Sequence, residues 1–187
     1  EVTVEQFFRD PEHGARRCDG RPCNHSPNVI AERLRHPMNN VRWQTALDFA
    51  EWLGADLPDD NQWEWAARGA GNQAFPWGRE PPDCSRSVGT NAAAEDDPVC
   101  SDGSTTHEVC SREAGLSAQK LCDLLGNVRE YVRPDDVEEG ACLSPNPPRG
   151  NICQYARGGA FTTPASEHCL EYRVPCREKR INGANSV

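Results

Sequence analysis

Residues 57–69 read LPDDNQWEWAARG, and this stretch says more about the fold than any other part of the chain. Asp59 carries a carboxylate of the kind that helix N-termini prefer, and Gln62 follows at the capping-box spacing of three residues. The apolar residues that come next share one face of the predicted helix: Trp63, Ala66 and Ala67. Gly69 is expected to end this helix, because glycine adopts the closing conformation without a steric cost.

Two further helices are predicted nearer the N-terminus. In the first, Thr3 is followed by Gln6 at the same capping-box spacing, and Pro11 ends the segment. The second is expected over residues 43–53, where apolar side chains recur at steps of three and four. Gly54 fits the left-handed position after its last turn.

The remaining sequence indicates a loop-rich domain. Glycine and proline number 15 each and occur throughout the chain, which is typical of short elements joined by many ordered loops. Helical and strand periodicity fades between Phe75 and Gly115. Disulfides would stabilise such a segment, by about 2–4 kcal/mol each.

The composition excludes several classes of protein. A length of 187 residues makes one domain the default, and a net charge of −9 disfavours nucleic-acid binding. No run of 18 apolar residues is present, so no membrane span is predicted. The ten cysteines include no C-x-x-C pair, which favours disulfides over zinc ribbons or thioredoxin-like motifs. We therefore expect an exported protein of the periplasm, the cell envelope or the extracellular space.

Several short motifs follow one another along the chain. They are Val41-x-Trp43-x-x-Ala46, Trp52-Leu53-Gly54, WEWAARG at 63–69, Phe75-Pro76-Trp77-Gly78, LCDLLGNVREY at 121–131 and Arg157-Gly158-Gly159-Ala160. This succession resembles the formylglycine-generating enzyme (sulfatase-modifying factor) domain family. The run Val109-Cys110-Ser111 leading into Leu121-Cys122-Asp123 is similar to the cysteine-rich, secreted bacterial branch of that family.

The resemblance implies an α+β fold related to C-type lectins, with a few helices on small twisted sheets, many loops and stabilising disulfides. It implies a single domain over residues 1–187, trimmed before the family's final Gly-Phe-Arg strand. The tryptophans are expected to pack in the core, the alternative being a platform for stacking sugars. They are Trp43, Trp52, Trp63, Trp65 and Trp77.

Family members that oxidise a substrate cysteine hold Cu(I) between two cysteine thiolates, which suit this soft ion. Counting back from Tyr172-Arg173 places Cys169 on the second thiolate, and counting forward from Gly158-Gly159 places Thr163 on the first. A hydroxyl cannot replace a thiolate on Cu(I), so the resemblance implies an incomplete copper site. An active oxidase would need Cys169 to find another soft ligand, such as Cys176.

The resemblance also implies a structural calcium site in the motif at 121–131. Its ligands fall on two carboxylates and two backbone carbonyls: Asp123, Gly126, Val128 and Glu130. Calcium binds six to eight hard oxygen atoms, and this set would supply part of that number. The alternative is that Asp123 and Glu130 are solvated acids of a loop.

Two cysteine pairs lie close enough in sequence for short-loop disulfides. These candidates are Cys18 with Cys23 and Cys169 with Cys176. Zinc held by the first pair with His13 and His25 is an alternative, although the spacing matches no common zinc finger. Asn24-His25-Ser26 fits the N-glycosylation pattern, a match that we interpret as chance.

We therefore expect an exported domain that binds a protein, peptide or carbohydrate ligand through loops near its C-terminus. The polar side chains expected on that surface are Thr162, Thr163, His168, Glu171, Arg173, Arg177 and Asn182. The alternative from another class is an active copper-dependent oxidase that converts a sulfatase cysteine to formylglycine, with Cys169 as a catalytic residue. A non-haem iron enzyme is a third hypothesis, but the five histidines show no metal-ligand spacing.

Overall fold

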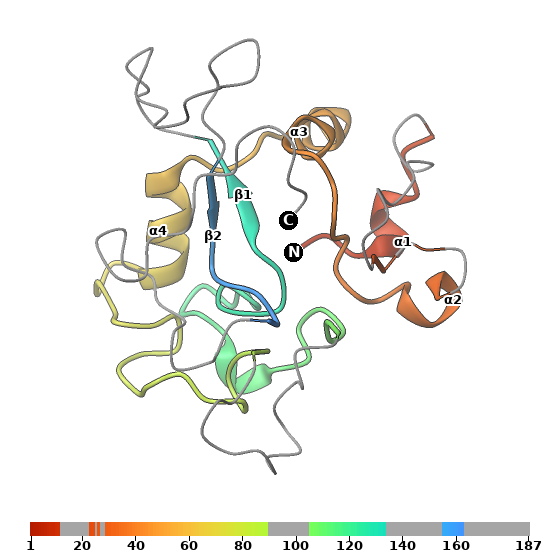
Figure 1. The fold of residues 1–187 in the computed structure, drawn as a ribbon. Helices are drawn as coiled ribbons and strands as arrows, with labels where there is room; N and C mark the ends of the chain where they lie inside the picture. Colours follow the sequence, from red (N-terminus) through yellow and green to blue (C-terminus); the bar gives the residue numbers. More distant parts are fainter. Residues whose placement is uncertain (12–22, 25, 27–28, 90–104, 134–154, 163–187) are drawn as a thin grey trace, which may run out of the picture.

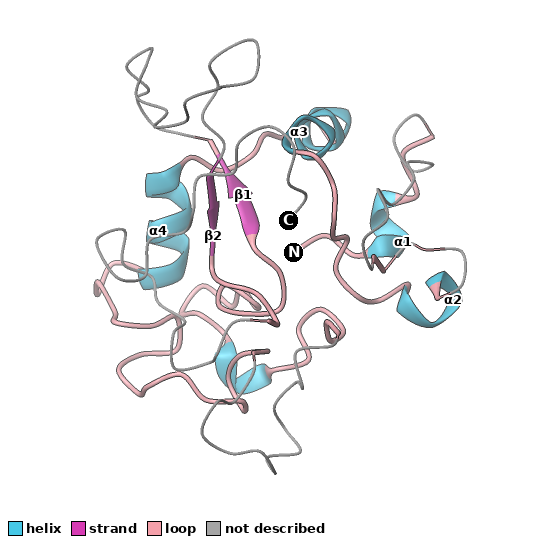
Figure 2. Ribbon diagram, in the orientation of Figure 1, coloured by secondary structure: helices cyan, strands magenta, loops and turns pink. Residues whose placement is uncertain are grey.

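The computed structural model describes seven helices and strands within residues 1–11, 23–24, 26, 29–89, 105–133 and 155–162. The helices are α1 (Val4–Phe7), α2 (Ile30–Arg33), α3 (Trp43–Trp52), α4 (Asp60–Arg68) and the 3-10 helix η1 (Glu113–Gly115), and the strands are β1 (Glu130–Val132) and β2 (Tyr155–Arg157). Figure 1 shows the two strands between α4 and α3, and α1 and α2 next to one another on the side away from α4. Most of the described chain outside these elements is loop and turn (Figure 2), as expected of a loop-rich α+β fold.

The predicted capping boxes are present at the start of two helices. At α1, Gln6 N–H donates to Thr3 Oγ1 over 3.1 Å, and Thr3 N–H donates to Gln6 Oε1 over 2.9 Å. At α4, Gln62 N–H donates to Asp59 Oδ1 over 2.7 Å, and Asp59 N–H donates to Gln62 Oε1 over 3.0 Å. Each pair satisfies two backbone groups that a helix terminus would otherwise leave without a partner.

The helices differ from the sequence prediction at several places. Helix α1 ends at Phe7, before Pro11, and the 3-10 helix η1 lies at the end of the segment in which no periodicity was found. Helix α2 was not predicted, because residues 30–33 form only four helical residues and no side chain caps their N-terminus. Helix α3 ends at Trp52, and Gly54 follows in the left-handed region with φ 70°, as predicted.

The sheet brings together two motifs that lie far apart in the sequence. Strand β1 pairs with β2 in antiparallel register, with Glu130 opposite Arg157 and Val132 opposite Tyr155. A bridge between Asp59 and Arg133 continues this pairing toward the start of α4. The loop at 121–131 and the Arg157-Gly158-Gly159 turn therefore lie side by side (Figure 1).

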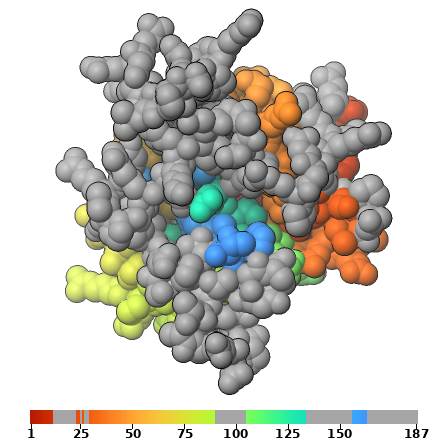
Figure 3. All heavy atoms as spheres, in the orientation of Figure 1, coloured from red at the N-terminus to blue at the C-terminus, as the bar shows by residue number. Residues whose placement is uncertain are grey.

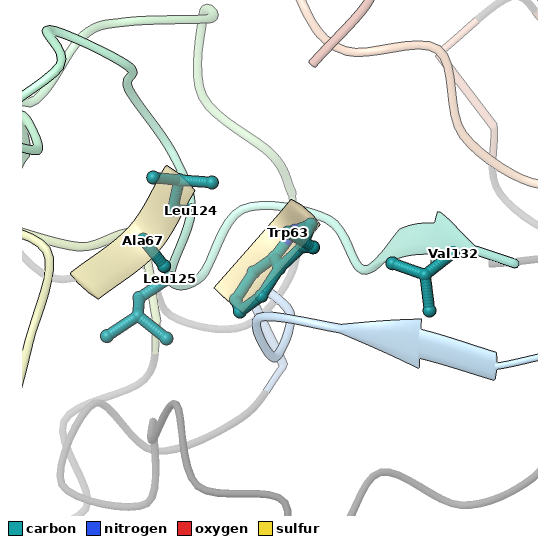
Figure 4. Close-up of a cluster of buried hydrophobic side chains, with 5 residues drawn as sticks. All are labelled: Trp63, Ala67, Leu124, Leu125 and Val132. Carbon is teal, nitrogen blue, oxygen red and sulfur yellow. The ribbon is translucent and has the colours of Figure 1, made fainter. Parts of the chain in front are cut away.

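Two clusters of buried apolar side chains flank the sheet. The first joins α4 to the loop at 121–131 and to β1 (Figure 4), and its members are Trp63, Ala67, Leu124, Leu125 and Val132. The second joins α3 to both strands through Trp43, Tyr131 and Ala156. Burial of these side chains provides the main stabilising contribution to the helix–sheet contacts.

The expectation that every tryptophan packs in the core is wrong for two of the five. Trp43 and Trp63 are buried, but Trp65 is 61 % exposed and Trp52 is 46 % exposed. Trp65 follows Trp63 by two residues, which turns it to the opposite face of α4. Trp52 is the last residue of α3, and one side of its ring packs on Phe49 with ring centroids 5.7 Å apart.

A buried polar cluster holds residue 24 between two segments of the chain. Asn24 is 6 % exposed, and its Nδ2 donates to the Pro37 carbonyl over 2.7 Å and to Thr106 Oγ1 over 2.8 Å. His36 Nδ1 also lies 2.8 Å from Thr106 Oγ1, and burial lowers the pKa of His36. An Asn24 side chain in these contacts cannot carry a glycan, which agrees with a chance match to the glycosylation pattern.

Arg157 links β2 to α4 through a buried ionic contact. Its Nη1 lies 3.2 Å from Asp60 Oδ1, and its Nη2 lies 3.0 Å from Glu64 Oε2. The guanidinium also lies over the Trp63 ring, 4.7 Å from the centroid, so the cation contacts both carboxylates and an aromatic face.

Replacing Arg157 by Met should lower the free energy of unfolding by about 2–4 kcal/mol, because two carboxylates lose their buried partner. Urea denaturation measures this loss. The matched control is Arg35→Met, which removes an ion pair with Glu108 whose side chains are 75 % and 47 % exposed. That variant should change stability by less than about 0.5 kcal/mol, and equal losses would contradict the role of Arg157.

Candidate metal site

The loop before β1 is tightly turned and buried. Asp123, Gly126 and Asn127 all adopt positive φ values, of 57°, 86° and 57°. Backbone hydrogen bonds hold the turn from two sides, from Gly126 N–H to the Gly158 carbonyl over 2.7 Å and from Asn127 N–H to the Val88 carbonyl over 2.8 Å. These contacts fix the backbone on which the predicted calcium ligands stand.

Gly158 approaches this loop so closely that no other residue fits. A Cβ atom at Gly158 would lie 2.7 Å from the Leu124 carbonyl oxygen, and the residue has φ +91°. The second position of the Arg157-Gly158-Gly159 motif therefore serves a packing role that only glycine fulfils.

The four residues of the predicted calcium site lie within this one loop and the first residue of β1. Asp123 is 6 % exposed, and the Glu130 side chain is 18 % exposed. Within the described part of the chain, no hydrogen bond ends on the carbonyl oxygens of Gly126 or Val128. The alternative that both acids are solvated is wrong for Asp123, which is buried.

A third carboxylate, which the sequence analysis did not find, lies beside this set. The Glu1 side chain is 1 % exposed and accepts hydrogen bonds from Asn127 Nδ2 over 2.8 Å and from Val128 N–H over 3.2 Å. The residues that follow Glu1 pair with another segment, through hydrogen bonds from Val4 N–H to the His36 carbonyl and from Met38 N–H to the Val2 carbonyl. The only signal in the sequence was the position of Glu1 two residues before the capping residue Thr3.

The carboxyl groups interact strongly with one another. Burial raises the pKa of Glu1 well above its usual value, and the nearby charges of Asp123 and Glu130 raise it further. Burial also raises the pKa of Asp123, although the amide of Cys110 opposes that shift. Buried acids that repel one another are favourable surroundings for a cation.

Each of these acids has a defined partner. Asp123 Oδ2 accepts a hydrogen bond from Cys110 N–H over 2.6 Å, and Glu130 Oε2 accepts one from Trp63 Nε1 over 2.6 Å. The arrangement thus offers carboxylate and carbonyl oxygens, which are the hard donors that calcium prefers. The donor set fits calcium better than a soft metal.

A disulfide lies directly against Asp123. Cys110 and Cys122 are joined, with Cα atoms 5.2 Å apart, so neither sulfur is a thiolate that could bind a metal. Cys23 and Cys84 are disulfide-bonded as well. Among the described residues no cysteine is free, in agreement with the predicted disulfide framework. Cys18, the suggested partner of Cys23, lies outside the described residues, as do His13 and His25.

The predicted copper and ligand-binding residues lie almost entirely outside the described part of the chain. Thr162 is described and exposed. The others fall on residues 163–187: Thr163, His168, Cys169, Glu171, Arg173, Cys176, Arg177 and Asn182. The space-filling view shows part of the 155–162 segment on the surface (Figure 3).

A cavity of about 410 Å³ opens next to the loop and was not predicted from the sequence. Its walls come from α1, α3 and β1, and include Phe7, Phe49, Leu53 and Tyr131. Glu1 and Glu130 also line it, so the cavity adjoins the carboxyl groups of the candidate metal site.

Comparison with known proteins identifies the family. The model of the sulfatase-modifying factor enzyme 1-like domain matches residues 1–186. The chain belongs to this family. The formylglycine-generating enzyme of Mycobacterium tuberculosis is 30 % identical over 162 residues, which cover 79 % of this chain and 53 % of that protein. This member of the sulfatase-modifying factor family therefore spans about half the length of such curated relatives.

Two other similarities refine the picture of the sulfatase-modifying factor domain. An inactive Cα-formylglycine-generating enzyme 2 from Bos taurus is 40 % identical over 52 residues, 27 % of this chain and 17 % of that protein. The crystal structure of CarF matches with a TM-score of 0.63 at 16 % identity, covering 98 % of this chain and 78 % of CarF, a likeness in fold alone.

No helix in the described ranges is long and apolar enough to cross a membrane.

Replacing Gly158 by Ala should destabilise the sulfatase-modifying factor domain by more than strain alone, because its Cβ would meet the Leu124 carbonyl. We expect a loss of about 3 kcal/mol or more in urea denaturation. Gly54→Ala is the control: it has φ +70° and nothing within 4 Å of its Cβ, so strain alone should cost about 1–2 kcal/mol. Similar losses for the two variants would argue against the close approach.

Proposed function

We propose that this domain is a calcium-stabilised, exported binding module of the formylglycine-generating enzyme family and not a cysteine oxidase. The observation that carries the proposal is an unequal retention of family features. Counting forward from Gly158-Gly159, Thr163 falls on the family's first thiolate position, while Asp123 and Glu130 are carboxylates at the two acidic positions that the resemblance implies for calcium. A hydroxyl at the first position leaves Cu(I) without one of its two soft ligands.

The calcium part of the proposal is supported by burial and charge. Asp123 and the Glu1 side chain are buried next to one another, and their pKa values are raised. Calcium bound through Asp123, Glu130 and the carbonyls of Gly126 and Val128 would compensate this negative charge. The ion would hold the loop against β1 and take no part in chemistry.

The binding part of the proposal rests on the polar residues that the sequence analysis expects on one surface near the C-terminus, Thr162 to Asn182. Function in such folds is carried by loops over a fixed framework. A relative described as inactive shows that family membership does not require oxidase activity. We assign the ligand to the protein, peptide or carbohydrate classes, in the periplasm, the cell envelope or the extracellular space.

The second candidate function is the copper-dependent oxidase. Cys169 is retained at the second thiolate position and is the observation that favours it. An active enzyme would need Cys169 as a thiolate and another soft ligand to replace the one missing at Thr163.

Calcium should raise the melting temperature of the chelator-treated protein by several degrees, because an ion that binds only the folded state stabilises it by mass action. At a calcium concentration of about 100 times Kd the gain is about 2.7 kcal/mol. Asp123→Asn should remove most of this shift, whereas Asp83→Asn, in an exposed turn, should retain it. A wild-type protein that melts at the same temperature with and without calcium would refute the site.

The wild-type protein should form no formylglycine when incubated with Cu(I), oxygen and a Cys-x-Pro-x-Arg peptide, because the copper site lacks a thiolate. Peptide mass spectrometry detects the conversion. The formylglycine-generating enzyme of Mycobacterium tuberculosis, assayed in parallel, shows that the conditions support turnover. Conversion by this domain above the protein-free background would establish the oxidase reading in place of the binding module.

A further inference from the structure

The disulfide between Cys110 and Cys122 and the candidate calcium ligand Asp123 form one closed unit. Cys122 precedes Asp123 in the chain, and its sulfur is bonded to that of Cys110. The backbone N–H of Cys110 then donates to Asp123 Oδ2 over 2.6 Å. The two segments are thus joined twice, once by a covalent bond and once through the carboxylate itself.

The disulfide also constrains the backbone on both sides of this contact. Cys110 has φ 61° and Asp123 has φ 57°, a left-handed conformation that costs a residue with a side chain about 1–2 kcal/mol. Without the covalent bond, Cys110 could relax to a more favourable conformation and withdraw its N–H from the carboxylate. Asp123 would then lose the partner that orients it.

The bond can be reached from solvent. Cys110 is exposed and Cys122 is half-buried, whereas the Asp123 carboxylate beside them is buried. A thiol reductant can therefore attack the disulfide without reaching the buried carboxylate of Asp123. Reduction converts the disulfide to two thiols, takes up two electrons and two protons, and oxidises a dithiol reductant to its own disulfide.

We propose that the Cys110–Cys122 disulfide regulates the calcium site, holding Asp123 for the ion when oxidised and lowering calcium affinity when reduced. This inference rests on the proposed function, because it requires that the loop binds calcium. It goes beyond a stabilising role for the disulfide, since a purely structural bond would change the unfolding free energy and leave the affinity of the folded protein unchanged.

Calcium titration of the intact chain by calorimetry tests the proposal. The variant Cys110→Ala/Cys122→Ala should bind calcium about tenfold more weakly than the wild type, since a preoriented ligand is lost. Asp83→Asn, in an exposed turn, is the control and should bind calcium as tightly as the wild type. Equal affinity of the wild type and the double-alanine variant would overturn the proposal.

A second measurement uses only the wild-type protein and does not depend on the folding of a variant. Because coupling is reciprocal, calcium should make the disulfide harder to reduce by the same factor. Alkylation and peptide mass spectrometry after equilibration with a dithiol buffer should show a tenfold shift, equal to about 30 mV for two electrons. An identical reduction equilibrium with and without calcium would overturn the regulatory link.

The two proposals fail in different ways. If the wild-type protein binds calcium but calcium does not change the reduction of the disulfide, the calcium site is supported and its regulation is refuted. Oxidised wild-type protein that binds no calcium refutes the site, and the regulation with it.

Discussion

The antiparallel pairing of β1 with β2 is the contact on which the rest of the structure depends. It places Arg157 under α4, where the guanidinium contacts Asp60, Glu64 and the Trp63 ring. It also sets Gly158 against the Leu124 carbonyl, and so fixes the turn that carries Asp123 and Glu130. These three residue pairs therefore connect α4, the loop that carries Asp123, and the buried cluster of Trp43, Tyr131 and Ala156.

Local signals in the sequence were sufficient to locate three of the helices. Thr3 and Asp59 start their helices through side-chain contacts with the third helical residue, which depend on only a few neighbouring positions. Helix α2 has no such cap, and Ile30 N–H at its start donates to the Ser26 carbonyl of the preceding turn. The burial of Trp65 was predicted wrongly because it was based on the family motif. The spacing of two residues from Trp63 turns Trp65 to the opposite face of the helix.

The sequence analysis found only the part of the candidate site that lies in one continuous segment of the chain. Its donors Asp123 and Glu130 lie within a single motif, so a resemblance could locate them. Glu1 lies more than a hundred positions away in the sequence and contacts the loop through its side chain, a long-range contact that no local pattern encodes. The pairing of Cys110 with Cys122 was equally beyond reach, because ten cysteines allow many connectivities and only the folded chain selects one.

The burial of Asn24 has a practical consequence for the production of this protein. Its amide nitrogen occupies the space between the Pro37 carbonyl and Thr106 Oγ1, so there is no room for a sugar on that atom. A eukaryotic secretory host can modify an Asn-x-Ser sequence while the chain is still unfolded. The attached glycan would then exclude residue 24 from its native contacts, and a bacterial host avoids this conflict between processing and folding.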